Sequence, residues 1–403
     1  MFKDHVRVFD CPTDTPKINV EGSGSLLAHW TNANGSMFKN PWPSYQAPNA
    51  MHIVSMLKDY FFSYPSIPKD IAARVPVVKP TWGADSSNNK IKATWLGHAC
   101  FMVELPVRPA TAGAGSSSPS RGARILFDPV FSERCAPIGF SRFTKMPCAI
   151  DEIPEVDAVV ISHNHYDHLD THTITTLSKR ERPPHFFAPL GNVKYFSSIG
   201  IPNERVHTLD WWKSQRVEVN TSISDKDIQS TKLTFDVTCT PAQHRTGRGL
   251  RDQNKTLWAS WVVQEVLPTP AAPTGGKDGV KVYFAGDTGY SATIASRSGE
   301  GLPTCPAFRE IGERWGSFDF AMIPIGAYKP RDVMSCVHCA PQDSVRIFRD
   351  IRAKKALGMH WGTWILTTED VLEPPIKLAE ECKKIGIPEG DFGVCNIGET
   401  VVF

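Results

Sequence analysis

The chain lacks several features that mark common classes of protein. No apolar run approaches the length of about 18 residues that a membrane-spanning helix requires. The formal net charge is only +2, which argues against a general binding surface for nucleic acid. We find no secretory signal, and the first 17 residues mix acidic with basic side chains, unlike an Arg-rich transit peptide. These absences favour an intracellular globular protein.

Cysteine and nucleophile patterns are also sparse. The ten Cys are scattered, without the dense framework of a small secreted scaffold, so we expect reduced thiols. One motif, Cys336-Val337-His338-Cys339, has no second Cys pair to complete a zinc site, which favours free thiols over a zinc or redox pair. We find no convincing Ser/His/Asp or Cys/His arrangement. The sequence therefore offers no evident protein nucleophile.

What the chain does contain is a cluster of histidines. The hexapeptide His163-Asn164-His165-Tyr166-Asp167-His168 follows the apolar run 158–161, so it lies where a buried strand ends and a loop begins. His163 and His165 can point the same way and hold one divalent ion, while Asp167 and His168 can turn toward a second ion. The alternative is a solvated polar turn, but only 13 of 403 residues are His. The hexapeptide therefore predicts metal binding.

The remaining pattern indicates one long domain after an N-terminal arm. Residues 1–50 are rich in Gly and Pro and predict an extended arm, and residues 51–403 follow as the main domain. Strands are predicted over 93–96, 100–103, 124–127, 158–161, 233–237, 258–263, 280–284, 320–323 and 356–357. Helices are predicted over 51–57, 171–179, 342–354 and 376–385, and surface inserts near 109–122, 268–279 and 291–303. Two sheets sandwiched between helices would accommodate these elements.

Three further candidate ligands each follow a predicted strand. They are His244, Asp287 and His360. Taken singly, each has an ordinary explanation: a loop histidine, a turn former between glycines, and a core residue beside Trp361. Together with the hexapeptide they supply five His and two Asp at strand ends, which is the number of ligands that a two-metal site requires.

These motifs, in this order, resemble the metallo-β-lactamase superfamily. Longer stretches resemble one branch of it, the N-acylphosphatidylethanolamine-hydrolysing phospholipase D family. The matching stretches are 40–43, 94–99, 157–170, 209–212, 284–290, 323–328, 360–363 and 372–375. The resemblance runs from about residue 38 to the C-terminus, interrupted by the three inserts. It implies a catalytic domain with the αββα sandwich of the metallo-β-lactamase fold, a homodimer, and metals at one edge.

The resemblance also implies two Zn²⁺ ions per chain. The implied ligands are His163, His165 and His244 for one ion, Asp167, His168 and His360 for the other, and Asp287 as the bridge between them.

Other residues take roles from the same resemblance. Asp167 and Asp287 are implied to be catalytic, together with His338, which matches a family histidine near the metals. Substrate contacts are implied for Tyr166, Gln243 and His338. The chain departs from the family after His244, where the segment 245–249 begins with Arg in place of the expected aromatic residue.

The implied reaction is hydrolysis of N-acylphosphatidylethanolamine to N-acylethanolamine and phosphatidic acid by a hydroxide shared between two zinc ions. The alternative is another hydrolase on the same scaffold, such as a lactonase or a nuclease, although a nuclease would need a basic track that this charge balance does not offer. A non-catalytic zinc-binding membrane adaptor is a further alternative. The complete ligand set argues against it, since structural zinc sites are usually closed four-ligand cages.

A phospholipid substrate requires contact with a membrane. We therefore expect a protein that is peripheral on an intracellular membrane, either an endomembrane or a mitochondrial one. The aromatic residues Tyr60, Phe61, Phe62 and Tyr64 would form either an apolar surface for lipid or ordinary core, and the sequence favours neither.

Overall fold

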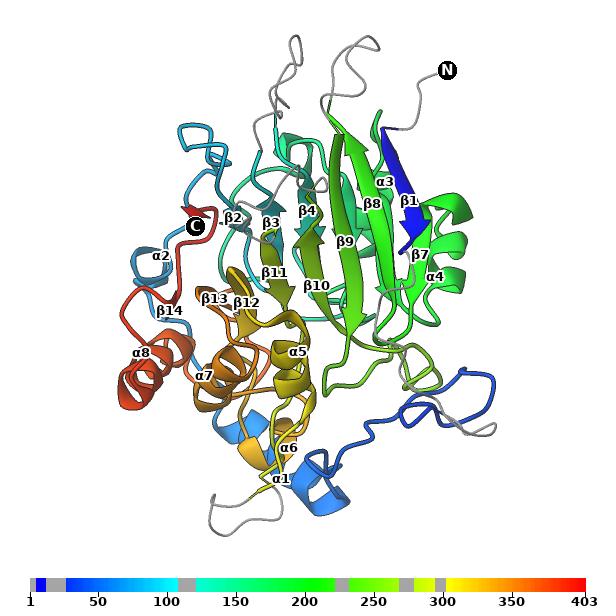
Figure 1. Cartoon of the computed structure of the whole chain (residues 1–403). Helices are drawn as coiled ribbons and strands as arrows, with labels where there is room; N and C mark the ends of the chain where they lie inside the picture. The colour runs from blue at the N-terminus through cyan, green and yellow to red at the C-terminus, as the bar shows by residue number, and fades with distance from the viewer. Residues whose placement is uncertain (1–4, 12–26, 108–120, 222–231, 268–278, 294–301) are drawn as a thin grey trace, which may run out of the picture.

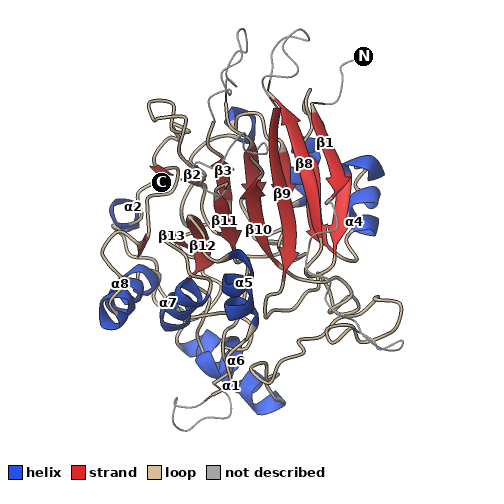
Figure 2. Ribbon diagram, viewed as in Figure 1, coloured by secondary structure: helices blue, strands red, loops and turns tan. Residues whose placement is uncertain are grey.

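Two β-sheets face each other, and helices cover their outer faces (Figures 1 and 2). The structure, a computed structural model, describes residues 5–11, 27–107, 121–221, 232–267, 279–293 and 302–403. Phe127 and Phe284 belong to opposite sheets, and their ring centroids lie 4.9 Å apart within the main apolar core. The core therefore fills the space between the sheets, and the predicted α/β sandwich is confirmed.

The first sheet has seven strands among the described residues, in the order β15-β2-β3-β4-β5-β6-β7. Their bounds are β2 (Lys92–Trp95), β3 (Phe101–Glu104), β4 (Arg124–Phe127), β5 (Ala158–Val160), β6 (His185–Pro189), β7 (Val206–Leu209) and β15 (Thr400–Val402). Strands β4 to β7 run parallel. Strands β5 and β6 are buried along their whole length, as expected for parallel strands covered on both faces.

The second sheet has eight strands in the described part of the chain, in the order β1-β8-β9-β10-β11-β12-β13-β14. Their bounds are β1 (Val6–Asp10), β8 (Ser214–Asn220), β9 (Lys232–Thr240), β10 (Ser260–Glu265), β11 (Lys281–Phe284), β12 (Phe320–Pro324), β13 (Ala356–Met359) and β14 (Phe392–Gly393). Strands β11 to β14 are parallel, whereas β1, β8, β9, β10 and β11 pair antiparallel with their neighbours in that order.

The helices form the outer layers. Their bounds are α1 (Ala50–Phe62), α2 (Ile71–Arg74), α3 (Thr171–Ser178), α4 (Val193–Ser198), α5 (Ala307–Trp315), α6 (Arg331–Met334), α7 (Pro341–Asp350) and α8 (Glu373–Ile385), with short 3₁₀ turns at Ile150–Glu152 and Asn203–Arg205. Ile174 and Leu177 of α3 pack with Leu126 and Phe186 of the seven-stranded sheet. Helix α7 contacts β12 of the eight-stranded sheet. Each sheet is therefore buried on both faces near its centre.

Helix α1 differs from the other long helices because none of its residues is buried. Asn49 caps its N-terminus, because the Asn49 side-chain oxygen accepts a hydrogen bond from the backbone N–H of His52 (3.0 Å). The helix extends past the predicted 51–57 and includes Phe61 and Phe62, which are each 82% exposed. No helix of the described residues is both long enough and apolar enough to cross a bilayer.

All nine predicted strands are present, as β2 to β5 and β9 to β13, but six further strands of the described residues were not predicted from the sequence. Strand β8 shows why, since only Val217 and Val219 among its seven residues are buried. Strand β1 lies inside the predicted N-terminal arm and pairs with β8 at the edge of the sheet. The predicted inserts near 109–122, 268–279 and 291–303 lie mostly outside the described residues, so they remain predictions.

Candidate metal centre

The predicted ligands meet at one edge of the sandwich because each lies beyond the carboxyl end of a strand. The hexapeptide follows β5, Asp287 follows β11, His360 directly follows β13, and His244 lies shortly after β9. Figure 1 shows the arrowheads of β9 and β11 pointing to the lower edge of the molecule. Side chains that follow aligned strand ends converge, even when their residues are far apart in the sequence.

His163, His165 and His244 form a first group. Their ligand nitrogens all lie within 4.8 Å of one another. His163 Nε2 is 2.8 Å from His165 Nδ1, and His244 Nε2 is 3.4 Å from that same His165 atom. Nitrogens bound to a tetrahedral zinc at about 2.0–2.1 Å would lie about 3.3 Å apart. The three imidazoles therefore fit one metal ion.

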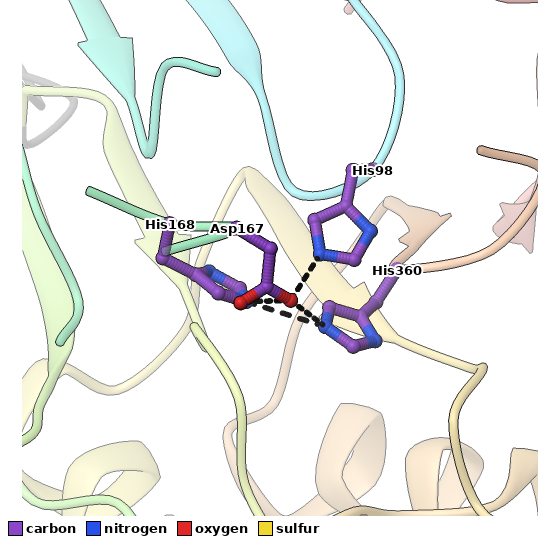
Figure 3. Close-up of side chains that lie close together, drawn as sticks. All are labelled: His98, Asp167, His168 and His360. Atoms are coloured by element: carbon purple, nitrogen blue, oxygen red, sulfur yellow. Dashed lines mark hydrogen bonds and ion pairs between the residues drawn. The ribbon is translucent and has the colours of Figure 1, made fainter. Parts of the chain in front are cut away.

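Asp167, His168 and His360 form a second group, which also contains His98 (Figure 3). His168 Nε2 lies 3.2 Å from His360 Nε2. Asp167 Oδ2 lies 3.6 Å from His168 Nε2 and 3.9 Å from His360 Nε2. The second group therefore contains all three residues predicted for it and one histidine that was not predicted.

Asp287 lies between the two groups. Its Oδ1 is 3.0 Å from His360 Nε2, and its Oδ2 is 3.2 Å from His168 Nε2. The same Oδ2 lies 3.9 Å from His163 Nε2 and 3.8 Å from His244 Nε2 in the first group. One carboxylate thus lies within 3.9 Å of ring nitrogens from both groups.

The donor set suits divalent transition metals. Neutral imidazole nitrogen and carboxylate oxygen are ligands that zinc, iron and manganese accept without any thiolate. Cys336 and Cys339 are buried free thiols, and neither belongs to a candidate metal group in the described residues. Their thiols instead donate to the backbone carbonyls of Val333 and Pro324. Each thiol is therefore engaged with a backbone carbonyl rather than with the other cysteine.

Burial keeps the imidazoles of the first group neutral. Desolvation lowers the pKa of His165 to about 4 and lowers the pKa values of His163 and His244 well below their usual range. Because a neutral imidazole keeps a lone pair, these three rings can bind a metal at neutral pH without first losing a proton.

The second group and Asp287 carry charge, unlike the neutral first group. Burial disfavours ionisation of Asp287, but the adjacent His168, His360 and His338 rings hold the pKa of Asp287 well below its usual range. Burial likewise disfavours protonation of His168, yet Asp287 and Asp167 raise the pKa of His168 well above its usual range. A proton on His168 therefore offsets part of the negative charge of the two carboxylates.

Outer hydrogen bonds orient the ligand rings. Asp128, a fully buried residue directly after β4, accepts from His168 Nδ1 (2.7 Å) and from Ser162 Oγ (2.5 Å). Ser162 Oγ in turn contacts His163 Nδ1 (2.8 Å). His244 Nδ1 lies 2.8 Å from the Val337 carbonyl oxygen. With Nδ1 engaged in this way, Nε2 of His163, His168 and His244 faces the candidate ion positions.

Gln243 is fully buried beside His244, although a substrate contact was predicted for it. Its Oε1 accepts a hydrogen bond from Ser44 Oγ (2.6 Å), and its Nε2 donates to the Cys336 carbonyl (3.0 Å). Asn40 Nδ2 donates to the His244 carbonyl (2.8 Å). The Gln243 amide therefore connects three segments of chain around the centre, which favours a positioning role over contact with substrate.

Tyr166 lies under a guanidinium group. Arg248 stacks over the Tyr166 ring, with 4.4 Å between its Cζ and the ring centroid, and over the Tyr195 ring at 4.5 Å. Arg248 Nε also donates to the Asn164 carbonyl (2.7 Å). The segment that departs from the family pattern therefore holds the hexapeptide from outside, while Arg245, next to the buried His244, is exposed.

His338 lies beside both groups, as predicted from the sequence. Its ring centroid is 5.1 Å from that of His244 and 5.3 Å from that of His360. Its Nδ1 lies 3.9 Å from Asp287 Oδ2. The side chain is 12% exposed, and burial lowers the pKa of His338 to about 3. It therefore presents a neutral imidazole at the margin of the centre.

Two site residues were not predicted, and each had a weak signal. Asp128 directly follows β4, the same kind of position that identified the other candidate ligands. His98 lies after β2 in one of the stretches that resemble the family. A single His or Asp after a strand is too common to indicate a site until the strand order is known.

Comparison with known proteins supports the superfamily and the family that the sequence motifs resemble. The profile of the beta-lactamase superfamily domain matches residues 123–361. The chain is 31% identical over 356 residues to the N-acyl-phosphatidylethanolamine-hydrolyzing phospholipase D 1 of Caenorhabditis elegans, covering 86% of each chain. It is also 31% identical over 380 residues to a mitochondrial protein of the same name from Saccharomyces cerevisiae, covering 88% of this chain and 73% of the yeast protein.

The fold and the ligand groups therefore define a metal-dependent hydrolase of the metallo-β-lactamase type. Within that superfamily, the chain belongs to the N-acyl-phosphatidylethanolamine-hydrolysing phospholipase D family.

Proposed function

We propose that the protein hydrolyses the phosphodiester of N-acylphosphatidylethanolamine, with two Zn²⁺ ions per chain, and releases N-acylethanolamine and phosphatidic acid. The observation that carries this proposal is the position of Asp287, which faces both ligand groups at 3.0–3.9 Å. The names of the relatives in nematode and yeast support the choice of substrate.

In the proposed centre, His163, His165 and His244 would hold one ion, Asp167, His168 and His360 would hold the other, and Asp287 would contribute to both. When bound, two such ions supply a nucleophile derived from water at neutral pH and neutralise charge on the phosphoryl oxygens. Water oxygen is added to phosphorus, the bond from phosphorus to the ethanolamine oxygen breaks, and that oxygen takes up a proton. No protein nucleophile is required.

The residues of the chain fix where this reaction takes place. Asp287 balances charge for both ions, and Asp128 holds His168 directly and His163 through Ser162. Neutral His338 lies at the margin, so its imidazole N–H can donate to a phosphoryl oxygen or to the departing alcohol oxygen. We assign substrate contact to His338 and keep Tyr166 as a further candidate.

We also propose that α1 places the protein on a membrane. Its exposed apolar side chains include Met51 (77%), Val54 (65%), Leu57 (49%), Phe61 and Phe62 (82% each). Helix α1 contacts α6, and α6 leads to the loop that carries His338. An apolar surface beside the site suits a substrate whose acyl chains lie in a bilayer. Figure 1 shows helix α1 at the lower edge of the molecule, near α6.

The rings next to Phe61 and Phe62 behave differently. Tyr60 and Tyr64 pack against Phe140, with centroid distances of 6.1 Å and 5.9 Å. The aromatic cluster is therefore divided, with Tyr60 and Tyr64 attaching the helix to the domain and Phe61 and Phe62 left for lipid. We further propose a homodimer that is peripheral on an endomembrane or mitochondrial membrane; the mitochondrial name of the yeast relative supports the latter.

A substrate panel with metal analysis tests the proposal. Purified protein would be assayed on mixed micelles of N-acylphosphatidylethanolamine, phosphatidylethanolamine or phosphatidylcholine, and separately on lactones and single-stranded nucleic acid. In H₂¹⁸O, we expect the label in phosphatidic acid and none in N-acylethanolamine. Turnover of lactones or nucleic acid without turnover of the lipid, by protein with its full metal content, would favour the alternative hydrolases. Full metal binding with no turnover of any substrate would favour the adaptor.

A further inference from the structure

We propose that His98 is a positioning residue of the second ligand group, holding the Asp167 carboxylate by a hydrogen bond from its Nε2. Its Nε2 lies 3.0 Å from Asp167 Oδ2, the atom of Asp167 that lies nearest to His168 and His360 (Figure 3). This inference rests on the proposed metal centre and is independent of the identity of the substrate.

Backbone conformation and hydrogen bonds hold the His98 ring beside Asp167. His98 follows β2 at the same sheet edge as the hexapeptide, and its φ of +50° lies in the left-handed region that residues other than glycine seldom adopt. Its N–H donates to Thr363 Oγ1 (2.7 Å), and its carbonyl accepts from Trp95 Nε1 (2.9 Å). Such a conformation persists when surrounding contacts over-determine it, and it is commonly found at functional sites.

The same turn is joined to a predicted metal ligand. The His360 N–H donates to the His98 carbonyl (3.0 Å), and His360 also has a left-handed φ, +65°. The ring centroids of His98 and His360 lie 4.1 Å apart, and those of His98 and Trp364 lie 4.9 Å apart with the two rings nearly perpendicular. His98 is only 3% exposed. The His98 turn and the His360 segment are therefore joined. One supplies the proposed ligand His360, and the other supplies His98, which supports the proposed ligand Asp167.

The geometry favours support of Asp167 over direct ligation by His98. Asp167, His168, His360 and Asp287 already supply four donors, which is the usual number for zinc. A carboxylate oxygen has two lone pairs, so Oδ2 can accept from His98 and still bind an ion. Histidine N–H donors to ligating carboxylates belong to the shell of groups that orient ligands and adjust metal affinity.

A matched pair of variants tests this role. His98→Gln keeps an N–H donor on a side chain of similar length, whereas His98→Met keeps the length and removes the donor. Affinities for both ions would be measured by Zn²⁺ titration of metal-free protein against a chelator, and the environment of each ion by the visible spectrum of Co²⁺-loaded protein. His185→Leu, which removes a buried imidazole where β6 begins, is the control for loss of a buried ring.

We expect His98→Met to lower the affinity for one of the two ions about 10–100-fold and to change the visible absorption bands of Co²⁺ bound at that position. His98→Gln should stay within about threefold of the native affinity, and His185→Leu should leave both ions unchanged. Native affinity for both ions in His98→Met would overturn the proposal. An equal loss of affinity for both ions in His98→Met would also overturn it. So would a His98→Gln variant whose metal affinity is as low as that of His98→Met, because that result would indicate direct ligation by His98.

A second pair of variants covers the case in which His98→Met does not fold. Thr363→Val removes the acceptor that holds the His98 turn, whereas Thr363→Ser keeps it. We expect Thr363→Val to weaken the same ion by a smaller factor and Thr363→Ser to behave as native protein, whereas identical affinities in the pair would contradict the proposal. Because none of these measurements uses lipid, a wrong substrate assignment would leave the His98 result intact.

Discussion

The metal edge and helix α1 lie at the same end of the molecule but are built in opposite ways. At the metal edge, polar side chains such as Asp128, His168 and Asp287 are almost completely buried and contact one another. In α1, apolar side chains are exposed, and no residue of the helix is buried. Both arrangements are costly for a protein alone in water, because buried charge and exposed apolar surface each need a partner. A bound cation would compensate the first region, and an apolar partner surface would compensate the second.

The largest effect should come from removal of metal. Native protein should contain two transition-metal ions per chain, because the seven predicted ligands are too many for one tetrahedral ion. Dialysis against a chelator should abolish hydrolysis and lower the melting temperature, and Zn²⁺ should restore both. Elemental analysis that finds no more than one ion per chain in fully active protein would remove the two-metal interpretation.

Asp287→Asn should come next in size. A neutral amide cannot balance two dications, so we expect the fold to persist and kcat/KM to fall at least about 100-fold, roughly 2.7 kcal/mol of barrier. The control is Asp85→Asn, which removes an exposed carboxylate. Circular dichroism would establish folding, and activity within about tenfold of native would show that Asp287 serves only as a turn residue.

Asp128→Asn tests whether the buried polar region acts as one unit. Asp128 contacts His168 directly and reaches His163 through Ser162, so the amide should disturb ligands of both ions. We expect metal affinity to fall about 10–100-fold for both ions in the chelator titration. Asp157→Asn is a suitable control, since Asp157 is equally buried but is paired with Arg121 before β5. That control should lose stability and keep metal affinity; the reverse result would contradict the role of Asp128.

Replacement of Phe61 and Phe62 by Ser tests the apolar region and should have the smallest effect on catalysis. Burial of a Phe side chain is worth about 1.5–3 kcal/mol, so the double variant should lose about tenfold or more in liposome binding, measured by flotation at low and high salt. Turnover of a soluble short-chain analogue should be unchanged. Ile376→Ser, in α8, removes another exposed apolar side chain as a control. Unchanged flotation of the double variant, or release of native protein by salt alone, would contradict apolar anchoring.

Much of the candidate site was predictable from the sequence. The hexapeptide concentrates four donors in six residues, and a spacing of two brings His163 and His165 toward one ion, so local geometry alone indicates the metal. His244, Asp287 and His360 could be predicted because each follows an apolar run, and residues after buried strands tend to converge at one sheet edge. The central strands were also predictable, because short, wholly apolar segments such as those of β5 and β12 are typical of strands buried on both faces of a sheet.

Only the tertiary structure decided which residues support the candidate ligands and which nearby side chains are exposed. Asp128 and His98 lie 40 and 70 residues away from His168, so only the packing of β2, β4 and β5 in one sheet could bring them together. The family resemblance implies a substrate contact for Gln243, whereas the structure places its amide in hydrogen bonds with Ser44 and the Cys336 carbonyl. Phe61 and Phe62 face solvent while Tyr60 packs on Phe140. A sequence pattern records which side chains are apolar or polar, but exposure depends on which surfaces the rest of the chain covers.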